Sequence, residues 1–316
     1  MPETPQFSPR RLLGATGFVA AQIGCGDVAD RAVPLEQCVA TVRRALEAGL
    51  NVVDTAPLYE DGYSEEIVGG ALAEWEREVG GQRQRIFVID KIDHLEEPVR
   101  PQIDASLGRL ALDYTDAFVL HGLSTLDGWA RAAAAGGALE QIEQAIRDGK
   151  TRFRGISSHH PDVLGAAIPS GLVDIVLFPV GPFVDERYVR DIIPLARKHR
   201  VGAICFKTFG AGKLLGDTEG YQRPLANRPR GKLSSGGNGA DSAPTLPRLT
   251  VEECLHYTLT VDPDVTLLGL SFPNEQNAAF AAVQSFRPLG DAEMSDLRAR
   301  AAVAIAGKGP VWWNPA

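Results

Sequence analysis

The sequence predicts a (β/α)8 barrel with an N-terminal hairpin and an extra C-terminal helix. Short apolar runs alternate with amphipathic segments eight times, which is typical of a parallel sheet whose faces are covered by helices. No Gly-x-Gly-x-x-Gly motif follows the first run, which argues against an open doubly wound sheet. A length of 316 residues fits one such barrel. We expect one domain over 1–316, with 216–247 as a flexible loop insertion after the seventh strand.

The expected strands are apolar runs bounded by glycine, proline or polar residues. They are 20–24, 50–53, 86–89, 117–120, 153–156, 173–178, 203–206 and 266–270. The expected helices show apolar residues at helical spacing. They are 34–48, 64–79, 101–110, 138–147, 161–167, 186–199, 251–260 and 275–285.

Local signals support particular helix ends and two additional elements. Pro34 suits a first turn, and Ser64 is expected to cap the second helix ahead of Glu65 and Glu66. Residues 12–19, with a glycine turn at 14–17, predict a hairpin that closes the bottom of the barrel. Residues 291–306 predict the extra C-terminal helix.

The composition indicates which binding partners and which cellular compartment to expect. A net charge of −8 argues against nucleic acid or an anionic membrane as the main partner, and no apolar run is long enough to span a bilayer. Residues 1–10 are polar and proline-rich, unlike a secretory signal. The four cysteines are widely spaced and two lie in apolar runs, so we interpret them as buried thiols. We expect a cytoplasmic protein; the sequence leaves its oligomeric state open.

Four polar residues follow neighbouring strands at the ends where barrel active sites form. Asp54 follows the second strand, Lys91 the third and His121 the fourth, while Tyr59 lies on the loop after the second. Taken singly, Lys91 could be a surface lysine and His121 a core histidine. Their convergence at one barrel mouth is hard to explain by packing, so we expect an active site there.

These residue types suit the protonation of a carbonyl oxygen. A free tyrosine has a pKa of about 10 and is a poor acid at neutral pH, but a nearby ammonium stabilises its phenolate and lowers that pKa. We expect Asp54 to pair with Lys91, and His121 to orient the substrate oxygen or to share in proton transfer. No Gly-x-Ser-x-Gly elbow indicates an acyl nucleophile, and no metal centre is expected.

From Arg10 to Ser285 the sequence resembles the aldo-keto reductases. The motifs are Asp54-Thr55-Ala56 with Tyr59 five residues after Asp54, then Ser64-Glu65 and Val68-Gly69, and they are completed by Lys91 and His121. The resemblance implies hydride transfer between a nicotinamide cofactor and a small-molecule aldehyde or ketone, with Tyr59 as the general acid in reduction. It favours NADPH as the cofactor and leaves NADH open.

The resemblance also implies a set of cofactor-binding residues. They are Gly26, Asp27, Ser157, Ser158, Phe206, Lys207, Thr208, Phe209, Gly210, Gly212, Ser271, Pro273, Glu275 and Gln276. The chain departs from the family pattern at three places. Ser158 replaces an asparagine, Leu177 or Phe178 stands where a glutamine is usual, and Gln276 stands near an arginine of many NADPH-preferring members.

Aromatic and apolar residues near the barrel mouth are candidates for the walls of the substrate pocket. They are Pro57, Leu58, Trp129, Phe183 and Trp312 or Trp313. Such walls fit a carbonyl compound with a hydrophobic substituent. Two other functions remain open from the sequence: a non-catalytic cofactor-binding regulatory subunit, and a lyase or dehydratase on the same barrel.

Overall fold

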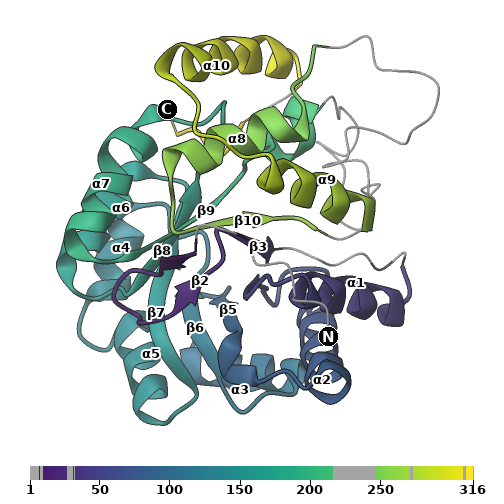
Figure 1. Cartoon of the computed structure of the whole chain (residues 1–316). Helices are drawn as coiled ribbons and strands as arrows, with labels where there is room; N and C mark the ends of the chain where they lie inside the picture. The colour runs from purple at the N-terminus through teal and green to yellow at the C-terminus, as the bar shows by residue number, and fades with distance from the viewer. Residues whose placement is uncertain are drawn as a thin grey trace.

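The structure is a computed structural model that describes residues 7, 10–26, 31, 33–215, 247–270, 273–308 and 311–315. Within these residues eight parallel strands close into a barrel in the order β10-β3-β4-β5-β6-β7-β8-β9, and helices surround them (Figure 1). The strands are β3 (Ile23–Gly26), β4 (Val52–Asp54), β5 (Phe87–Ile92), β6 (Thr115–Leu120), β7 (Thr151–Ser157), β8 (Ile175–Pro179), β9 (Gly202–Phe206) and β10 (Val265–Leu268). The predicted (β/α)8 fold is confirmed.

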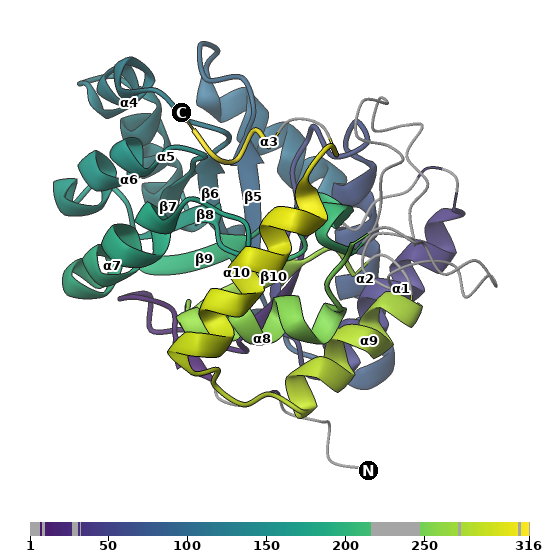
Figure 2. The same ribbon diagram turned by 90° about the horizontal axis from the view of Figure 1, so that it is seen from above.

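The helices pack around the barrel in chain order. They are α1 (Leu35–Glu47), α2 (Tyr63–Val79), α3 (Val99–Leu110), α4 (Leu126–Ala133), α5 (Ala138–Arg147), α6 (Pro161–Ala167), α7 (Ile193–His199), α8 (Val251–Val261), α9 (Pro273–Gln284) and α10 (Asp291–Ile305). The extra C-terminal helix is α10, and it lies against α8 on the outside of the barrel (Figure 2). Helix α4 was not predicted. The helix expected over 186–199 is a π-helical stretch (Tyr188–Ile192) that continues into α7.

Alternation along each strand decides which side chains reach the barrel axis. On β5, Phe87 and Ile89 belong to the interior cluster, whereas Val88 and Ile92 pack outward against the helices. Successive side chains of a strand point to opposite faces, so Lys91 continues the interior row. The same rule carries Asp54 inward after Val52 on β4, and His121 inward after Val119 at the end of β6. Three polar side chains therefore meet at one end of the interior.

The predicted hairpin closes the opposite end of the barrel. Strands β1 (Arg11–Leu12) and β2 (Val19–Ala20) pair antiparallel, and Leu13 between them is fully buried in the interior cluster. Gly14 has a φ of +52°, and a Cβ there would lie 2.3 Å from the backbone nitrogen of Gly202. Only glycine allows the turn to approach β9 this closely.

Two expected boundaries were wrong. The first barrel strand is Ile23–Gly26, because Ala20 belongs to the hairpin instead. Ser64 does not cap α2: Gly62, with a φ of +85°, is its N-cap, and Ser64 lies inside the first turn. The Ser64 hydroxyl accepts a hydrogen bond from Thr55 Oγ1 at 2.9 Å, so it ties α2 to the end of β4.

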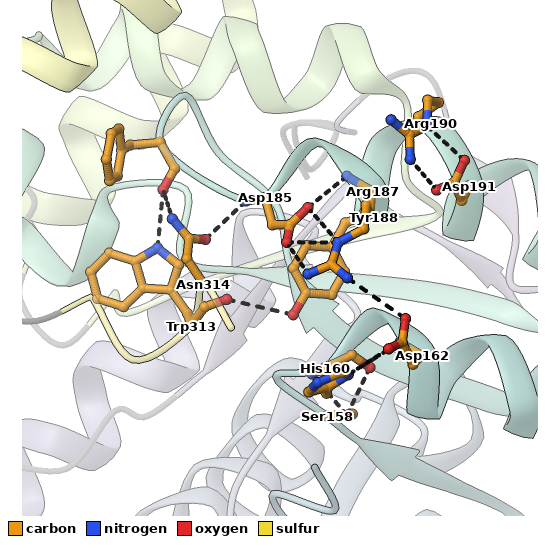
Figure 3. Close-up of polar contacts among 11 residues, drawn as sticks. Ser158, His160, Asp162, Asp185, Arg187, Tyr188, Arg190, Asp191, Trp313 and Asn314 are labelled. Atoms are coloured by element: carbon orange, nitrogen blue, oxygen red, sulfur yellow. Dashed lines mark hydrogen bonds and ion pairs between the residues drawn. The ribbon is translucent and has the colours of Figure 1, made fainter. Parts of the chain in front are cut away.

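The C-terminal tail returns from α10 to the loop after β8 (Figures 2 and 3). Trp313 Nε1 donates to the carbonyl oxygen of Phe183 at 3.0 Å, and the backbone N–H of Asp185 donates to Asn314 Oδ1 at 2.8 Å. The Tyr188 hydroxyl donates to the carbonyl oxygen of Trp313 at 3.5 Å. These contacts fasten the tail to the barrel.

Some expectations fall outside the described residues. They concern Asp27, Ser271 and residues 216–246 of the expected insertion. All four cysteines are buried, as expected, and burial raises the pKa of Cys25 to about 12. No helix in the described part of the chain is long and apolar enough to cross a membrane.

Candidate active site

Asp54 and Lys91 form an ion pair at the interior end of β4 and β5. Lys91 Nζ donates to Asp54 Oδ1 at 2.7 Å and to the carbonyl oxygen of Thr55 at 2.7 Å. The side chains of Lys91 and Asp54 are 2% and 5% exposed. Desolvation of two charges is costly unless they are paired and hydrogen-bonded, and both conditions are met here. The predicted pair is present in the structure.

Tyr59 covers this ion pair from the loop after β4. The ammonium of Lys91 lies 4.5 Å from the centroid of the Tyr59 ring. A cation at this distance from the aromatic face is attracted to the ring electrostatically, and it would also stabilise negative charge on the phenol oxygen. The Tyr59 N–H donates to the carbonyl oxygen of Ala56, which fixes the turn that carries the ring.

His121 completes the group of four predicted residues and is held by a residue that the sequence analysis missed. Its ring lies edge-on to the Tyr59 ring, with the two centroids 5.7 Å apart. Its Nδ1 is hydrogen-bonded to Asp93 Oδ1, and the other carboxylate oxygen of Asp93 accepts from the N–H of Leu58 at 2.8 Å. The Asp93 side chain is inaccessible to solvent, whereas that of His121 is 23% exposed.

The alternation of side-chain directions along β5 predicts that Asp93 faces the site. Two residues after Lys91, Asp93 continues the interior row of side chains, just beyond the last residue of the strand. Asp90 points the other way, toward α2, where burial and the carboxylate of Glu65 raise its pKa well above the ordinary value. Two acidic residues that flank Lys91 thus have different surroundings, and one of them reaches the site.

A second imidazole, that of His159, lies where the chain leaves β7, the strand beside β6. The His159 ring packs edge-on against the Phe206 ring at the end of β9, with centroids 5.3 Å apart. Burial, with Lys207 and His121 nearby, lowers the pKa of His159 to about 4. Its Nε2 is buried and has no hydrogen-bond partner among the described residues. A neutral ring therefore presents an unsatisfied polar atom to the interior.

The two serines before His159 have different surroundings. Ser158 Oγ accepts from the N–H of His160 at 3.1 Å and donates to the His160 carbonyl oxygen at 3.4 Å (Figure 3). These bonds lie within its own turn. Ser157, at the end of β7, and His159 both belong to the row that faces the interior.

The loop after β9 turns sharply in the described part, 207–215. Lys207, Gly210, Ala211 and Gly212 all have positive φ angles. The N–H of Gly210 donates to the carbonyl oxygen of Lys207 at 2.8 Å, and that of Gly212 donates to Phe209 at 2.9 Å. These two amides are therefore used inside the turn, and the glycines serve its conformation. Thr208 Oγ1 is buried and has no hydrogen-bond partner among the described residues.

Positive charge surrounds this loop. Lys207 Nζ lies 5.7 Å from the centroid of the Phe206 ring and 5.4 Å from that of Trp312 in the tail. Lys213 is fully buried, and burial together with Lys308 lowers its pKa to about 8. Trp312 is 44% exposed, whereas Trp313 is buried in the core. Of the two tail tryptophans considered for the pocket wall, only Trp312 faces outward.

The other expected wall residues divide in the same way. Leu58 is 53% exposed, and its N–H is bonded to Asp93. Trp129, on α4, is instead buried among the apolar residues between the strands and the surrounding helices. Phe183 is partly buried, and its carbonyl oxygen anchors the tail.

An arginine of α1, Arg44, lies beside the first turn of α9. Gln276 is fully buried: its Nε2 donates to the carbonyl oxygen of Thr41 at 2.6 Å, and its Oε1 accepts from Arg44 Nη1 at 2.7 Å. Arg44, from α1, also donates through Nη2 to Asn277 Oδ1 and lies 5.8 Å from the centroid of the Phe280 ring. Gln276 thus links α9 to α1, and Arg44 places a cation beside it.

Comparison with known proteins agrees with this geometry. The model of the Aldo/keto reductase family matches residues 20–299. The chain belongs to the aldo/keto reductase family.

Relatives of this aldo/keto reductase include oxidoreductases of known substrate. It is 29% identical to L-galactose dehydrogenase of Arabidopsis thaliana, over 89% of each chain. It is 26% identical to the NADH-specific methylglyoxal reductase of Escherichia coli, over 65% of this chain and 68% of the relative. The family and these relatives make the protein an oxidoreductase.

Solved structures share the fold of this aldo/keto reductase. The holo form of an aldo-keto reductase from Bacillus halodurans superposes with a TM-score of 0.66 and 25% identity, covering 92% of this chain and 95% of that one. An aldo/keto reductase from Klebsiella pneumoniae, in complex with NADP and acetate, superposes with a TM-score of 0.63 and 21% identity, over 90% and 93% of the two chains.

Proposed function

We propose that the protein reduces an aldehyde or ketone with NADPH, or oxidises the corresponding alcohol, at the site formed by Asp54, Tyr59, Lys91 and His121. The observation that carries this proposal is the position of the Lys91 ammonium. It lies 2.7 Å from Asp54 Oδ1 and 4.5 Å from the centroid of the Tyr59 ring, and the centroid of the His121 ring lies 5.7 Å from that of Tyr59.

The surroundings of the site fit a nicotinamide cofactor. A Cβ at Gly26 would lie 3.3 Å from Leu267 Cβ and 3.6 Å from Asp54 Oδ2, so the end of β3 keeps only a small residue beside the ion pair. His159 Nε2 and Thr208 Oγ1 are buried polar atoms that require a partner. A ligand with a carboxamide and phosphate groups would supply such partners.

Particular residues would hold each part of the cofactor. The Phe206 ring provides a stacking surface, and Ser157 and His159 provide polar atoms for the carboxamide, in place of the missing asparagine and glutamine. Lys207 and Thr208 would bind the pyrophosphate. Arg44, at the first turn of α9, would bind a 2′-phosphate together with the segment 273–276, and this supports NADPH over NADH.

Protein side chains would then control the proton. A bound nicotinamide would supply the hydride that the carbonyl carbon accepts. Tyr59 Oη donates its proton to the carbonyl oxygen, and Lys91 stabilises the phenolate that remains. Asp54 would keep Lys91 charged and positioned. His121 would donate a hydrogen bond from Nε2 to the carbonyl oxygen as the imidazolium, and would accept one from the alcohol hydroxyl as the neutral ring. Trp312 and Leu58, both exposed near the mouth, would contact the substituent of the carbonyl compound.

Steady-state oxidation of NADPH over a panel of aldehydes and ketones tests the proposal. We expect one equivalent of alcohol for each equivalent of NADPH consumed, and a loss of turnover in Tyr59→Phe with cofactor affinity unchanged. A regulatory subunit would bind NADPH without turnover of any carbonyl. A lyase or dehydratase would form product without net consumption of cofactor. Full turnover in Tyr59→Phe would contradict the assigned role of Tyr59.

A further inference from the structure

The hydrogen bonds of Asp93 define the protonation of the His121 ring. A backbone N–H is always a donor, so the donor at Leu58 makes Asp93 Oδ2 an acceptor. An ionised carboxylate has only acceptor atoms, so the bond between Asp93 Oδ1 and His121 Nδ1 requires a proton on Nδ1. Because the Asp93 side chain is inaccessible, water does not compete for these bonds.

We infer that Asp93 is a positioning residue that fixes the tautomer of His121, so that Nε2 is the nitrogen facing the substrate oxygen. With Nδ1–H held by Asp93, Nε2 carries a lone pair in the neutral ring and a proton in the imidazolium. His121 therefore exchanges hydrogen-bond roles at a single atom, next to Tyr59, without turning its ring. This inference rests on the proposed function for its catalytic consequence, although the tautomer itself does not.

Asp93 also links the loop that carries Tyr59 to His121. The same carboxylate that holds His121 holds the N–H of Leu58, on the loop that carries Tyr59 one residue later. One buried side chain thus sets the position of His121 relative to Tyr59, whose rings lie 5.7 Å apart. Among charged groups, Arg109 lies within electrostatic range of Asp93, and His159 lies within range of His121.

Asp93→Asn should invert the tautomer rather than merely weaken the bond. The N–H of Leu58 requires an oxygen opposite it, so the amide of the variant would turn its NH2 group toward His121 Nδ1. Nδ1 would then have to accept, and the proton of the neutral ring would move to Nε2. Removal of the corresponding carboxylate in the serine-protease triad acts through the same change of tautomer.

The ring nitrogens of His121 can be observed directly by NMR in protein labelled with ¹⁵N-histidine. The signals of His121 are assigned by their loss in His121→Gln. In the native protein, above the pH at which the ring becomes neutral, we expect a protonated Nδ1 and an unprotonated Nε2. In Asp93→Asn we expect the reverse pattern. A native ring protonated at Nε2, or an unchanged pattern in Asp93→Asn, would overturn the inference.

Kinetics provide the second measurement. We expect kcat/KM for carbonyl reduction to fall at least about tenfold in both Asp93→Asn and Asp93→Ala, with the Kd for NADPH within twofold of the native value. Asp113→Asn, at an exposed aspartate, is the matched control and should keep native turnover. Native turnover in Asp93→Asn would overturn the inference.

The two proposals fail in different ways. If the native protein reduces no carbonyl, the proposed function fails, but the tautomer measurement still decides whether Asp93 sets the state of His121. If Asp93→Asn does not fold, the spectrum of the native protein decides the question by itself, because a proton on Nε2 would contradict the role of Asp93.

Discussion

Exchange of Lys91 for methionine tests the buried ion pair on which the site depends. Methionine keeps most of the side-chain volume but removes the ammonium that donates at 2.7 Å to both Asp54 Oδ1 and the Thr55 carbonyl oxygen. Each hydrogen bond to a charged group contributes about 1.5–3 kcal/mol, and truncation of one member of a buried pair costs about 3–5 kcal/mol. We therefore expect Lys91→Met to lower the free energy of unfolding by about 3–5 kcal/mol.

The double variant separates the pair from simple loss of packing. In Asp54→Asn/Lys91→Met no charge of the pair is left without its counterion, so we expect the double variant to lose at least about 2 kcal/mol less than the sum of the single variants. Urea unfolding at pH 7, followed by tryptophan fluorescence, measures each free energy. Arg100 and Asp104, which are 46% and 47% exposed, form the control pair, and we expect a much smaller coupling between them because solvent screens exposed charges. Additive losses at Asp54 and Lys91, or a coupling no larger than that of the control, would refute the reasoning.

Two further predictions concern the cofactor end of the site. Arg44→Met should raise the Kd for NADPH about tenfold and leave the Kd for NADH unchanged, because only NADPH carries a 2′-phosphate. Fluorescence titration measures both constants. Equal changes in the two would argue against this role of Arg44. The pKa of His159 is lowered from an ordinary 6.5 to about 4, so the unfolded chain takes up this proton as the pH falls below 6.5 whereas the native protein does so only near pH 4. Stability should therefore fall as the pH falls through this window, and His159→Gln should remove about 2 kcal/mol of the loss between pH 7.5 and 5. His199→Gln at an exposed site should not, and parallel curves for His159→Gln and the native protein would count against the buried neutral ring.

Much of the fold follows from local patterns in the sequence. The alternation of apolar runs and amphipathic segments predicts the barrel, because strands buried on both faces must be apolar throughout and helices must bury one side. The helices predicted over 138–147 and 161–167 match α5 and α6. The boundary errors arose from competition between elements: Ala20 is apolar like a barrel strand, but it pairs with Arg11 in the hairpin.

The four predicted site residues lie close together because the carboxyl ends of the strands in a barrel lie at one rim. Asp54, Lys91 and His121 lie at the ends of consecutive strands, so their neighbourhood follows from topology alone. What the sequence could not supply were contacts between distant segments. Arg44 and Gln276 are hydrogen-bonded although they are 232 positions apart in the sequence. The burial of His159 Nε2 beside Phe206 likewise depends on the packing of β7 and β9, which are distant in the sequence.

The central claim is that Tyr59 gives its proton to a carbonyl oxygen as a hydride arrives from the cofactor. The most direct test is a single turnover in which the protein, premixed with NADPH, meets a carbonyl substrate, and the loss of NADPH absorbance is followed in the native protein and in Tyr59→Phe. The account predicts rapid oxidation of bound NADPH in the native protein and a rate at least about a hundredfold lower in Tyr59→Phe, which still binds NADPH. Equal rates of NADPH oxidation in the two proteins would contradict it.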